Sequence, residues 1–198
     1  MKKNFYVFRH GQTENNANNI WQGAQLNPPL NEVGKAQAQE LGKKLAPLGL
    51  EIIYSSNLKR AIQTTLIANE KLELPTVLDA EFREVNFGEA EGLTYDEVFA
   101  RFGELKQKVA IPKPDTWNSR FPGKESESKY EVWLRVSNEI KKIAQTTKYT
   151  TIGISAHAGV LSSLLAGLEA HGIELPNCCI AHIIYDDKAD SLSFVEML

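Results

Sequence analysis

The chain has 198 residues, of which 42% are hydrophobic and 24% are charged, and these are the proportions of an ordinary globular protein. A chain of this length can bury about 70% of its unfolded surface, so we expect a single domain that needs neither a disulfide nor a metal to fold. The net charge of -3 and the lack of a dense block of Lys and Arg argue against a nucleic-acid partner.

Cysteine usage and apolar segments give expectations about location. The two cysteines, Cys178 and Cys179, are adjacent, which excludes the spaced pairs of disulfide-rich domains and the C-x-x-C spacing of zinc or redox sites. The first apolar run, residues 5–8, is far shorter than a signal-peptide core or the roughly 20 residues of a membrane span. We therefore expect a cytoplasmic protein that has no membrane partner.

Alternating apolar runs and amphipathic segments predict the secondary structure of the chain. We expect strands at residues 5–8, 52–54, 77–78 and 150–155, and a final pair within residues 178–187 and 191–198. We expect one helix from Asn31 to about residues 47–49, one after residues 55–57, and others at 95–102, 127–145 and 159–168. This order predicts a three-layer α/β/α sandwich with a largely parallel central sheet.

The first two helices each have an apolar face and a candidate cap. Asn31 is expected to cap the first helix. The apolar face of that helix consists of Val33, Ala38, Leu41 and Leu45. Residues 55–57 (Ser-Ser-Asn) are expected to cap the second helix. The apolar face of the second helix consists of Ala61, Ile62, Thr65, Leu66 and Ala68.

The pattern loosens between about residues 81 and 129, where we expect a cap insertion. Residues 111–126 (IPKPDTWNSRFPGKES) contain three prolines, a glycine and few periodic apolar positions. Long loops in compact domains are often functional, and this favours the interpretation that the segment forms a lid that covers a binding site. The alternative is a surface excursion, and whether residues 103–126 move as a lid stays open.

Three predicted strands are each followed by residues that bind anions or transfer protons. The first strand runs into Arg9, His10 and Gly11, the second leads to Arg60, and the late strand runs into His157. Each of these residues taken alone is more typical of a structural or solvated position. Because the carboxyl ends of parallel strands meet at one edge of a sheet, we expect the cationic groups to lie together around an anion.

Seven stretches in order along the chain resemble one family, the histidine phosphatase superfamily, whose best-known branch is the cofactor-dependent phosphoglycerate mutases. The stretches are FRHGQTENN (8–16), WQG (21–23), PLNEVGKAQAQELG (29–42), IYSSNLKRAIQT (53–64), FREVNFGEAEG (82–92), FPGKES (121–126) and ISAHAG (154–159). The resemblance implies a phosphoglycerate mutase-like fold, with a single domain over residues 1–198 and a cap at about 81–129.

The resemblance also implies a role for each matching residue. His10 would be the nucleophile that accepts the phosphoryl group, and Glu84 would be the proton donor. The residues that would surround the phosphate oxygens are Arg9, Arg60 and His157. Asn16 would help to bind the phosphate, and Gln22 and Gly23 would belong to a loop that closes over it. Glu125 and Ser126 would flank the substrate entrance.

The chemistry of these residues supports such roles without a metal or a cofactor. Neutral His10 can attack phosphorus in line, and positioned cationic donors stabilise the charge on the phosphoryl oxygens. His157 is expected to act best when protonated. Glu84 has three close competitors, Glu81, Glu89 and Glu91, and its alternative is a loop carboxylate paired with Arg83. His171 and His182 are expected to be structural, and the histidines lack metal-ligand spacing.

Three functions compete at this point. The first is a phosphatase acting on a small phosphomonoester, which the short chain favours and which is similar to the α-ribazole phosphatase and broad-specificity branches. The second is a phosphoglycerate mutase, in which His10 returns the phosphoryl group to the bound molecule. The third is a regulatory protein that recognises phosphate without turnover. The sequence leaves the substrate and the oligomeric state open.

Overall fold

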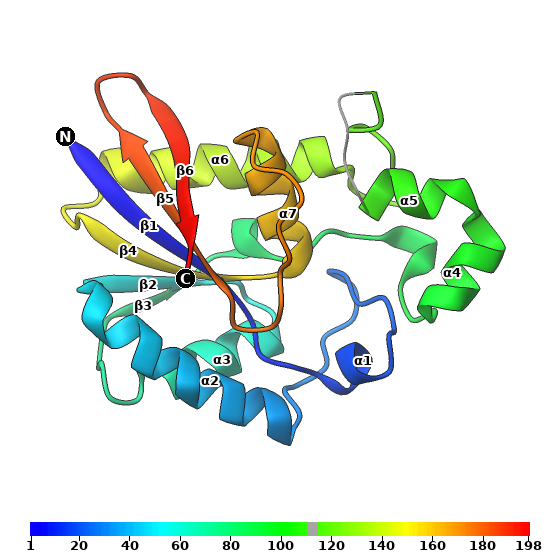
Figure 1. The fold of residues 1–198 in the computed structure, drawn as a ribbon, viewed down its shortest axis with the longest axis horizontal. Coiled ribbons are helices and arrows are strands. Elements are labelled where there is room, and N and C mark those ends of the chain that lie inside the picture. Colours follow the sequence, from blue (N-terminus) through cyan, green and yellow to red (C-terminus); the bar gives the residue numbers. More distant parts are fainter. Residues whose placement is uncertain (111–114) are drawn as a thin grey trace.

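The computed structural model describes residues 1–110 and 115–198, and a six-stranded sheet forms the centre of this part of the chain (Figure 1). The strands are β1 (Lys2–Arg9), β2 (Ile52–Ser55), β3 (Thr76–Leu78), β4 (Thr151–Ala156), β5 (Ile180–Asp186) and β6 (Ser191–Met197). Their order is β3-β2-β4-β1-β5-β6, with β1 to β4 parallel and β5 and β6 antiparallel. The expected largely parallel sheet is confirmed.

Helices cover both faces of this sheet and complete the predicted sandwich. On one face lie α2 (Glu32–Leu45) and α3 (Lys59–Asn69), and on the other lie α6 (Lys129–Thr146) and α7 (Ala158–Gly167) (Figure 1). Alternate residues of β1 serve the two layers, because Phe5 and Val7 pack in the cluster of α6 and α7 whereas Phe8 packs in that of α2. Short 3₁₀ turns lie at Ala46–Leu48, Ala80–Phe82 and Gly88–Ala90.

The start of α2 was predicted correctly, but the start of α3 was not. Asn31 caps α2 by accepting a hydrogen bond from the Gly34 N–H at 2.8 Å. The helix α3 begins one residue after Leu58, which makes no side-chain cap. The Ser56 hydroxyl accepts a hydrogen bond from the Leu58 N–H at 3.3 Å, one residue before the helix, and it also contacts a histidine of the candidate site described below.

The predicted apolar faces of α2 and α3 each contain one error. Val33 is 52% exposed and Leu66 is 63% exposed. The buried face of α3 includes Arg60 and Thr64 instead, because this side of α3 faces polar groups at the end of β1. A hydrophobic pattern therefore fails where a helix lines a polar site.

The described residues of the expected cap, 81–110 and 115–129, contain one α-helix that was predicted and one that was missed. The helix α4 (Tyr95–Phe102) matches the prediction, and α5 (Glu104–Ala110) follows it directly. The sequence gives little sign of α5 because Val109 is its one buried residue. The predicted loop at 111–126 falls partly outside the described residues, and the long helix begins at Lys129 rather than at residue 127.

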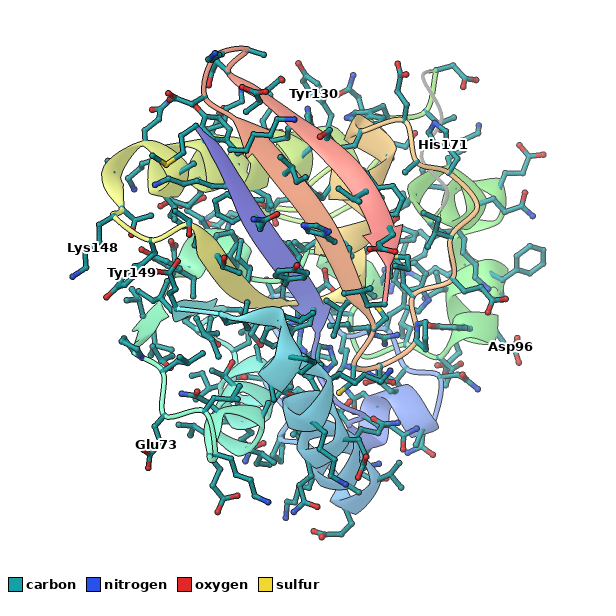
Figure 2. The ribbon with its side chains drawn as sticks, turned by 60° about the vertical axis from the view of Figure 1, so that its left-hand side comes forward. Glu73, Asp96, Tyr130, Lys148, Tyr149 and His171 are labelled. Carbon is teal, nitrogen blue, oxygen red and sulfur yellow. The ribbon has the colours of Figure 1, made fainter. Side chains whose placement is uncertain are left out.

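The cap lies beyond the carboxyl ends of the parallel strands, together with the short α1 (Glu14–Ala17) (Figure 1). Figure 2 shows Asp96 of α4 on one side of the molecule and Lys148 and Tyr149, which precede β4, on the opposite side. Within the described residues, no helix is both long enough and apolar enough to cross a membrane.

The two helix faces can be tested with a matched pair of truncations. Leu41 of α2 is 1% exposed, whereas Leu66 of α3 is 63% exposed. We expect Leu41→Ala to lower the free energy of unfolding by about 2–5 kcal/mol, because it leaves a cavity in the core. Leu66→Ala is expected to change it by less than about 0.5 kcal/mol. Urea unfolding measures both, and equal losses would contradict this placement of the faces.

Candidate active site

The register of the sheet brings two histidines together. Arg9 of β1 pairs with Ala156 of β4, so the next residue of each strand, His10 and His157, emerges at the same edge. The ring centroids of these two histidines are 5.1 Å apart. Both side chains are buried, with 2% and 0% of their surface exposed. The residues that follow β1 and β4 therefore lie together at this edge of the sheet, as the sequence predicted.

Hydrogen bonding fixes the tautomer of His10. Its Nδ1 lies 2.6 Å from the carbonyl oxygen of Gly11, which can only accept, so Nδ1 carries the hydrogen. The Nε2 atom then keeps its lone pair. Burial, followed by the charges of Arg60 and Arg9, holds the pKa of His10 well below the ordinary value of 6.5. His10 is therefore neutral at pH 7 and has the electronic form of a nucleophile.

Close backbone packing holds the loop that carries His10. A side chain on Gly11 would overlap the carbonyl group of Gly34, and one on Gly34 would overlap the backbone of Gln12. The Gly11 N–H donates to Thr64 Oγ1 of α3 at 2.9 Å, and Asn177 Nδ2 donates to the His10 carbonyl oxygen at 2.9 Å. The position of His10 thus depends on glycines in two segments and on contacts from distant elements.

Two arginines bring positive charge close to His10. Arg60 is fully buried and donates from its two terminal nitrogens to the carbonyl oxygens of Leu26 at 2.9 Å and Gly23 at 3.1 Å. Arg9 donates to the carbonyl oxygen of Leu175 at 2.6 Å. Burial lowers the pKa of Arg60 to about 10, so both guanidinium groups remain charged at neutral pH. Backbone carbonyl oxygens hold both guanidinium groups in place, and each guanidinium group keeps further N–H donors that are not used by these bonds.

His157 differs from the sequence expectation in its charge. Burial and the charge of Arg60 hold its pKa well below 6.5, so this structure favours the neutral ring rather than the protonated one. Its Nε2 lies 2.7 Å from Ser56 Oγ, and that hydroxyl has no other acceptor among the residues described. We infer that Ser56 donates to Nε2, which leaves a hydrogen on Nδ1 of His157. Neutral His157 can therefore still donate a hydrogen bond.

Several buried nitrogen donors around His10 have no hydrogen-bond partner in the described part of the chain. They include Arg9 Nε, Arg60 Nε, His157 Nδ1 and Gln22 Nε2, and Trp21 Nε1 is a further one on a residue that lines the same cavity as His10. Leaving one buried donor unsatisfied costs about 1–3 kcal/mol. A ligand with several acceptor oxygens, such as a phosphoryl group, offers acceptors to guanidinium, imidazole and amide donors alike. This donor set therefore fits an anion.

His10 and two of the donor residues, Arg9 and Gln22, line a cavity of about 380 Å³, close to the lower end of the range for small-molecule sites. Two more predicted site residues, Asn16 and Glu84, line the same cavity. The remaining three contact these groups or one another: the ring of His157 lies against that of His10, and buried Arg60 donates to the Gly23 carbonyl oxygen. The structure thus brings eight of the ten predicted residues together.

Glu84 reaches the cavity from the loop before the cap. One carboxylate oxygen accepts from the Val85 N–H at 2.9 Å, and the other accepts from the Gly159 N–H at the start of α7 at 3.1 Å. Gly159 permits this approach, because a side chain there would overlap Glu84. Neither Glu89 nor Glu91 lines the cavity, since Glu89 pairs with Arg101 and Glu91 accepts from backbone N–H groups.

A partly buried ion-pair cluster holds the loop of Glu84. Arg135 of α6 donates to the carbonyl oxygens of Arg83 at 2.9 Å and Glu84 at 3.3 Å. Glu127 binds Arg135 at 2.8 Å and Arg83 at 3.1 Å, and it accepts from the Asn86 N–H at 3.0 Å. Arg83 therefore pairs with Glu127 and not with Glu84.

Glu125 and Ser126 lie outside the lining of the cavity. Glu125 is exposed, and the Ser126 hydroxyl donates to the Phe121 carbonyl oxygen at 2.7 Å. The neighbouring pair, Glu127 and Ser128, is the one engaged: Glu127 holds the Glu84 loop and Ser128 caps α6. A signal for this was present, because Ser128 begins the capping pattern S-x-x-E with Glu131.

Two lysines that sequence reasoning missed also line the cavity. Lys129 is the first residue of α6 and only 4% exposed, and burial lowers its pKa to about 8. Lys106 of α5 donates to the Tyr95 carbonyl oxygen at 3.0 Å and lies over the Tyr95 ring. A lysine in the first turn of an amphipathic helix is ordinarily solvated, so no local pattern distinguishes Lys129 from a surface residue.

Residues 1–110 and 115–198 contain neither a set of metal ligands nor a reactive thiol pair. No set of three or more His, Cys, Asp or Glu side chains is placed there to hold a metal ion. Cys178 and Cys179 are buried free thiols, and burial raises the pKa of Cys178 to about 12. Cys178 is therefore an unreactive packing residue.

Comparison with known proteins points to one family. Residues 5–196 match the histidine phosphatase superfamily (branch 1). The chain is 30% identical to the uncharacterized phosphatase PhoE of Bacillus subtilis, over 92% of this chain and 88% of that protein. It is 32% identical to a 2,3-bisphosphoglycerate-dependent phosphoglycerate mutase of Bartonella henselae, over 85% of this chain and 82% of that protein. A phosphoglycerate mutase structure from Bacillus anthracis has the same fold, with a TM-score of 0.86 at 24% identity over 98% and 92% of the chains.

The role of Glu127 can be tested against its neighbour Glu125. Glu127→Gln leaves the partly buried Arg135 without its carboxylate partner, so we expect the free energy of unfolding to fall by about 1–3 kcal/mol. Glu125→Gln removes the same charge from an exposed position and is expected to change it by less than about 0.5 kcal/mol. Urea unfolding compares the two, and a larger loss from Glu125→Gln would contradict the cluster described above.

The lowered pKa values of His10 and His157 predict a pH dependence of stability. The unfolded chain binds a proton at each of these histidines more tightly than the folded protein does. The contribution of the two neutral histidines to the free energy of unfolding is therefore complete above about pH 6.5 and is lost as the pH falls. Each histidine contributes a slope of about 1.4 kcal/mol per pH unit between its two pKa values. We expect His157→Asn to flatten the slope of unfolding free energy between pH 7 and 5, and the exposed control His171→Asn to keep it. An unchanged slope in His157→Asn would contradict the assignment.

Proposed function

We propose that this chain, which belongs to the histidine phosphatase superfamily, hydrolyses a small phosphomonoester through a phosphohistidine formed on Nε2 of His10. One observation carries the proposal: a buried, neutral His10 with a free Nε2 lone pair lies among buried N–H donors that have no acceptor in the described part of the chain. A nucleophile beside an unfilled set of anion donors is the arrangement that phosphoryl transfer requires.

In the first step, His10 Nε2 attacks phosphorus in line with the ester oxygen. The N–P bond forms as the P–O bond to the leaving group breaks. Arg9, Arg60 and the Nδ1–H of His157 stabilise the charge on the equatorial oxygens, and Asn16 and Gln22 complete their hydrogen bonds. The Gly11 carbonyl oxygen keeps the His10 ring oriented and stabilises the positive charge that the ring gains. This step needs no metal or cofactor.

Glu84 is placed to handle the proton. Its carboxylate lines the same cavity as His10, and two backbone N–H groups fix its orientation. As the general acid, Glu84 gives its proton to the leaving alkoxide as the P–O bond breaks. After the alcohol departs, the carboxylate removes a proton from water, the water oxygen attacks phosphorus, and the N–P bond breaks to release phosphate.

A phosphoglycerate mutase is the second candidate, and it is favoured by the likeness to the Bartonella henselae enzyme. Both reactions share the phosphohistidine and differ in its acceptor, which is water in the phosphatase and a hydroxyl of the bound molecule in the mutase. The hydrolase is preferred because, among the described residues, the cap contributes only α4 and α5 to shield the site from water. A phosphate-recognising regulator would need neither His10 as a nucleophile nor Glu84 as an acid.

Phosphate release from a panel of small phosphomonoesters in EDTA tests the reaction itself. We expect turnover in EDTA, inhibition by vanadate, and its abolition in His10→Ala with the fold intact by circular dichroism. Isomerisation of 3-phosphoglycerate in the presence of 2,3-bisphosphoglycerate, without phosphate release, would favour the mutase. Loss of activity in EDTA that a metal restores would contradict the metal-free step, and no turnover of any kind would favour the regulator.

The proton donor can be tested by varying the leaving group. Glu84→Gln is expected to lower kcat about 10²- to 10⁴-fold for an alkyl phosphate. The loss is expected to be far smaller for p-nitrophenyl phosphate, whose leaving group departs without a proton. Glu89→Gln, which alters an acidic residue outside the cavity lining, serves as the control. Equal losses for both substrates would argue against Glu84 as the acid.

A further inference from the structure

Lys129 occupies a position that packing alone does not explain. It continues the buried stripe of α6 that contains Val132, Val136 and Ile140, at helical spacing. An apolar residue would satisfy that stripe, whereas burying an ammonium group costs several kcal/mol unless it is paired. The lysine is nonetheless 4% exposed, and it lines the cavity. A functional reason for a buried charge is therefore needed.

The ammonium group of Lys129 has no hydrogen bond or ion pair among the described residues. Glu84 is the acidic group whose charge acts on it, and both oxygens of Glu84 already accept backbone N–H groups. The donors that the proposed function assigns to the phosphoryl group belong to other residues, namely Arg9, Arg60, His157 and Gln22. Lys129 therefore adds a positive charge to the cavity that this set of donors does not include.

The net charge of the side chains that line the cavity also favours a ligand with more than one anionic group. Three cationic side chains line it, namely Arg9, Lys106 and Lys129, against the single carboxylate of Glu84 among the described residues, and buried Arg60 adds a further positive charge beside them. A phosphomonoester dianion leaves part of this positive charge unbalanced. Lys106 of α5 also lines the cavity. Its ammonium group donates to the Tyr95 carbonyl oxygen and lies over the Tyr95 and Phe99 rings, and it has no ion pair among the described residues.

We propose that Lys129 is a specificity residue that binds a second anionic group of the substrate, a carboxylate or a further phosphate, while the scissile phosphoryl group is held at His10. This inference rests on the proposed function and narrows it to phosphomonoesters that carry a second negative charge within the span of one small cavity. In the alternative, Lys129 only fills space at the start of α6. This alternative predicts that replacing Lys129 does not change how kcat/KM depends on the second anionic group of the substrate.

Three ligands with one carbon skeleton separate the possibilities. Glycerol 3-phosphate carries a hydroxymethyl group where 3-phosphoglycerate carries a carboxylate and glycerol 1,3-bisphosphate carries a second phosphate. We expect kcat/KM to be about 10- to 100-fold higher for one of the doubly charged members than for glycerol 3-phosphate, as for a hydrogen bond between charged groups. Which member shows the preference identifies the second anion.

Substitution of Lys129 assigns that preference to its ammonium group. In Lys129→Met and Lys129→Gln, the ratio of kcat/KM between the preferred ligand and glycerol 3-phosphate is expected to fall to within about threefold of one. Two variants are used so that a packing defect in one does not decide the result. Lys142→Met removes an exposed lysine from the same helix and is expected to keep the native ratio. A ratio that survives both Lys129 substitutions would overturn the assignment.

A binding measurement separates this inference from the proposed reaction. His10→Ala protein cannot consume ligand, so calorimetric Kd values for the three compounds test the second subsite even if the native protein turns none of them over. We expect the preferred doubly charged ligand to bind at least tenfold more tightly than glycerol 3-phosphate, and this difference to vanish in His10→Ala/Lys129→Met. A Kd ratio near one in His10→Ala would overturn the inference whether or not the native protein is a phosphatase.

Discussion

The hydrogen bond from His10 Nδ1 to the Gly11 carbonyl oxygen is the contact on which the rest of the site depends. It fixes one tautomer and presents the Nε2 lone pair to the cavity, while burial beside Arg60 keeps the ring neutral. The glycine contacts between Gly11 and Gly34 allow the loop to fold this tightly. The sheet register then adds His157, so a local hydrogen bond and a long-range strand pairing together build the nucleophile and its neighbour.

The other half of the site is assembled from the segment that crosses the carboxyl ends of the strands. The cluster of Glu127, Arg83 and Arg135 fixes the loop of Glu84, and α6 delivers Lys129 only two residues after Glu127. One stretch of chain thus positions both the proposed acid and the proposed second anion site. Proton transfer and substrate selection would consequently depend on the same helix start, whereas the proposed phosphate binding would depend on the strand ends and on α3.

The sequence predicted the elements whose residues repeat with a clear period, and it failed where a tertiary contact decides. The sheet, α2 and the group around His10 follow from apolar periodicity and from the ends of parallel strands. Leu66 was misplaced because α3 turns a polar face to the site. The sequence did not single out Glu127, because its role depends on its ion pair with Arg135, which the local pattern does not reveal. Lys129 could not be found because local pattern does not reveal burial of a charged residue.

The covalent intermediate on His10 gives the most direct test of the account. Native protein mixed with ³²P-labelled phosphomonoester, quenched in alkali within the first turnover and digested, is expected to yield label on the peptide that contains His10. That label is expected to be stable to base and labile to acid, as a phosphoramidate is, and to be absent from His10→Ala. Turnover with no label on His10, or label on a hydroxyl or carboxyl side chain, would contradict the phosphohistidine mechanism.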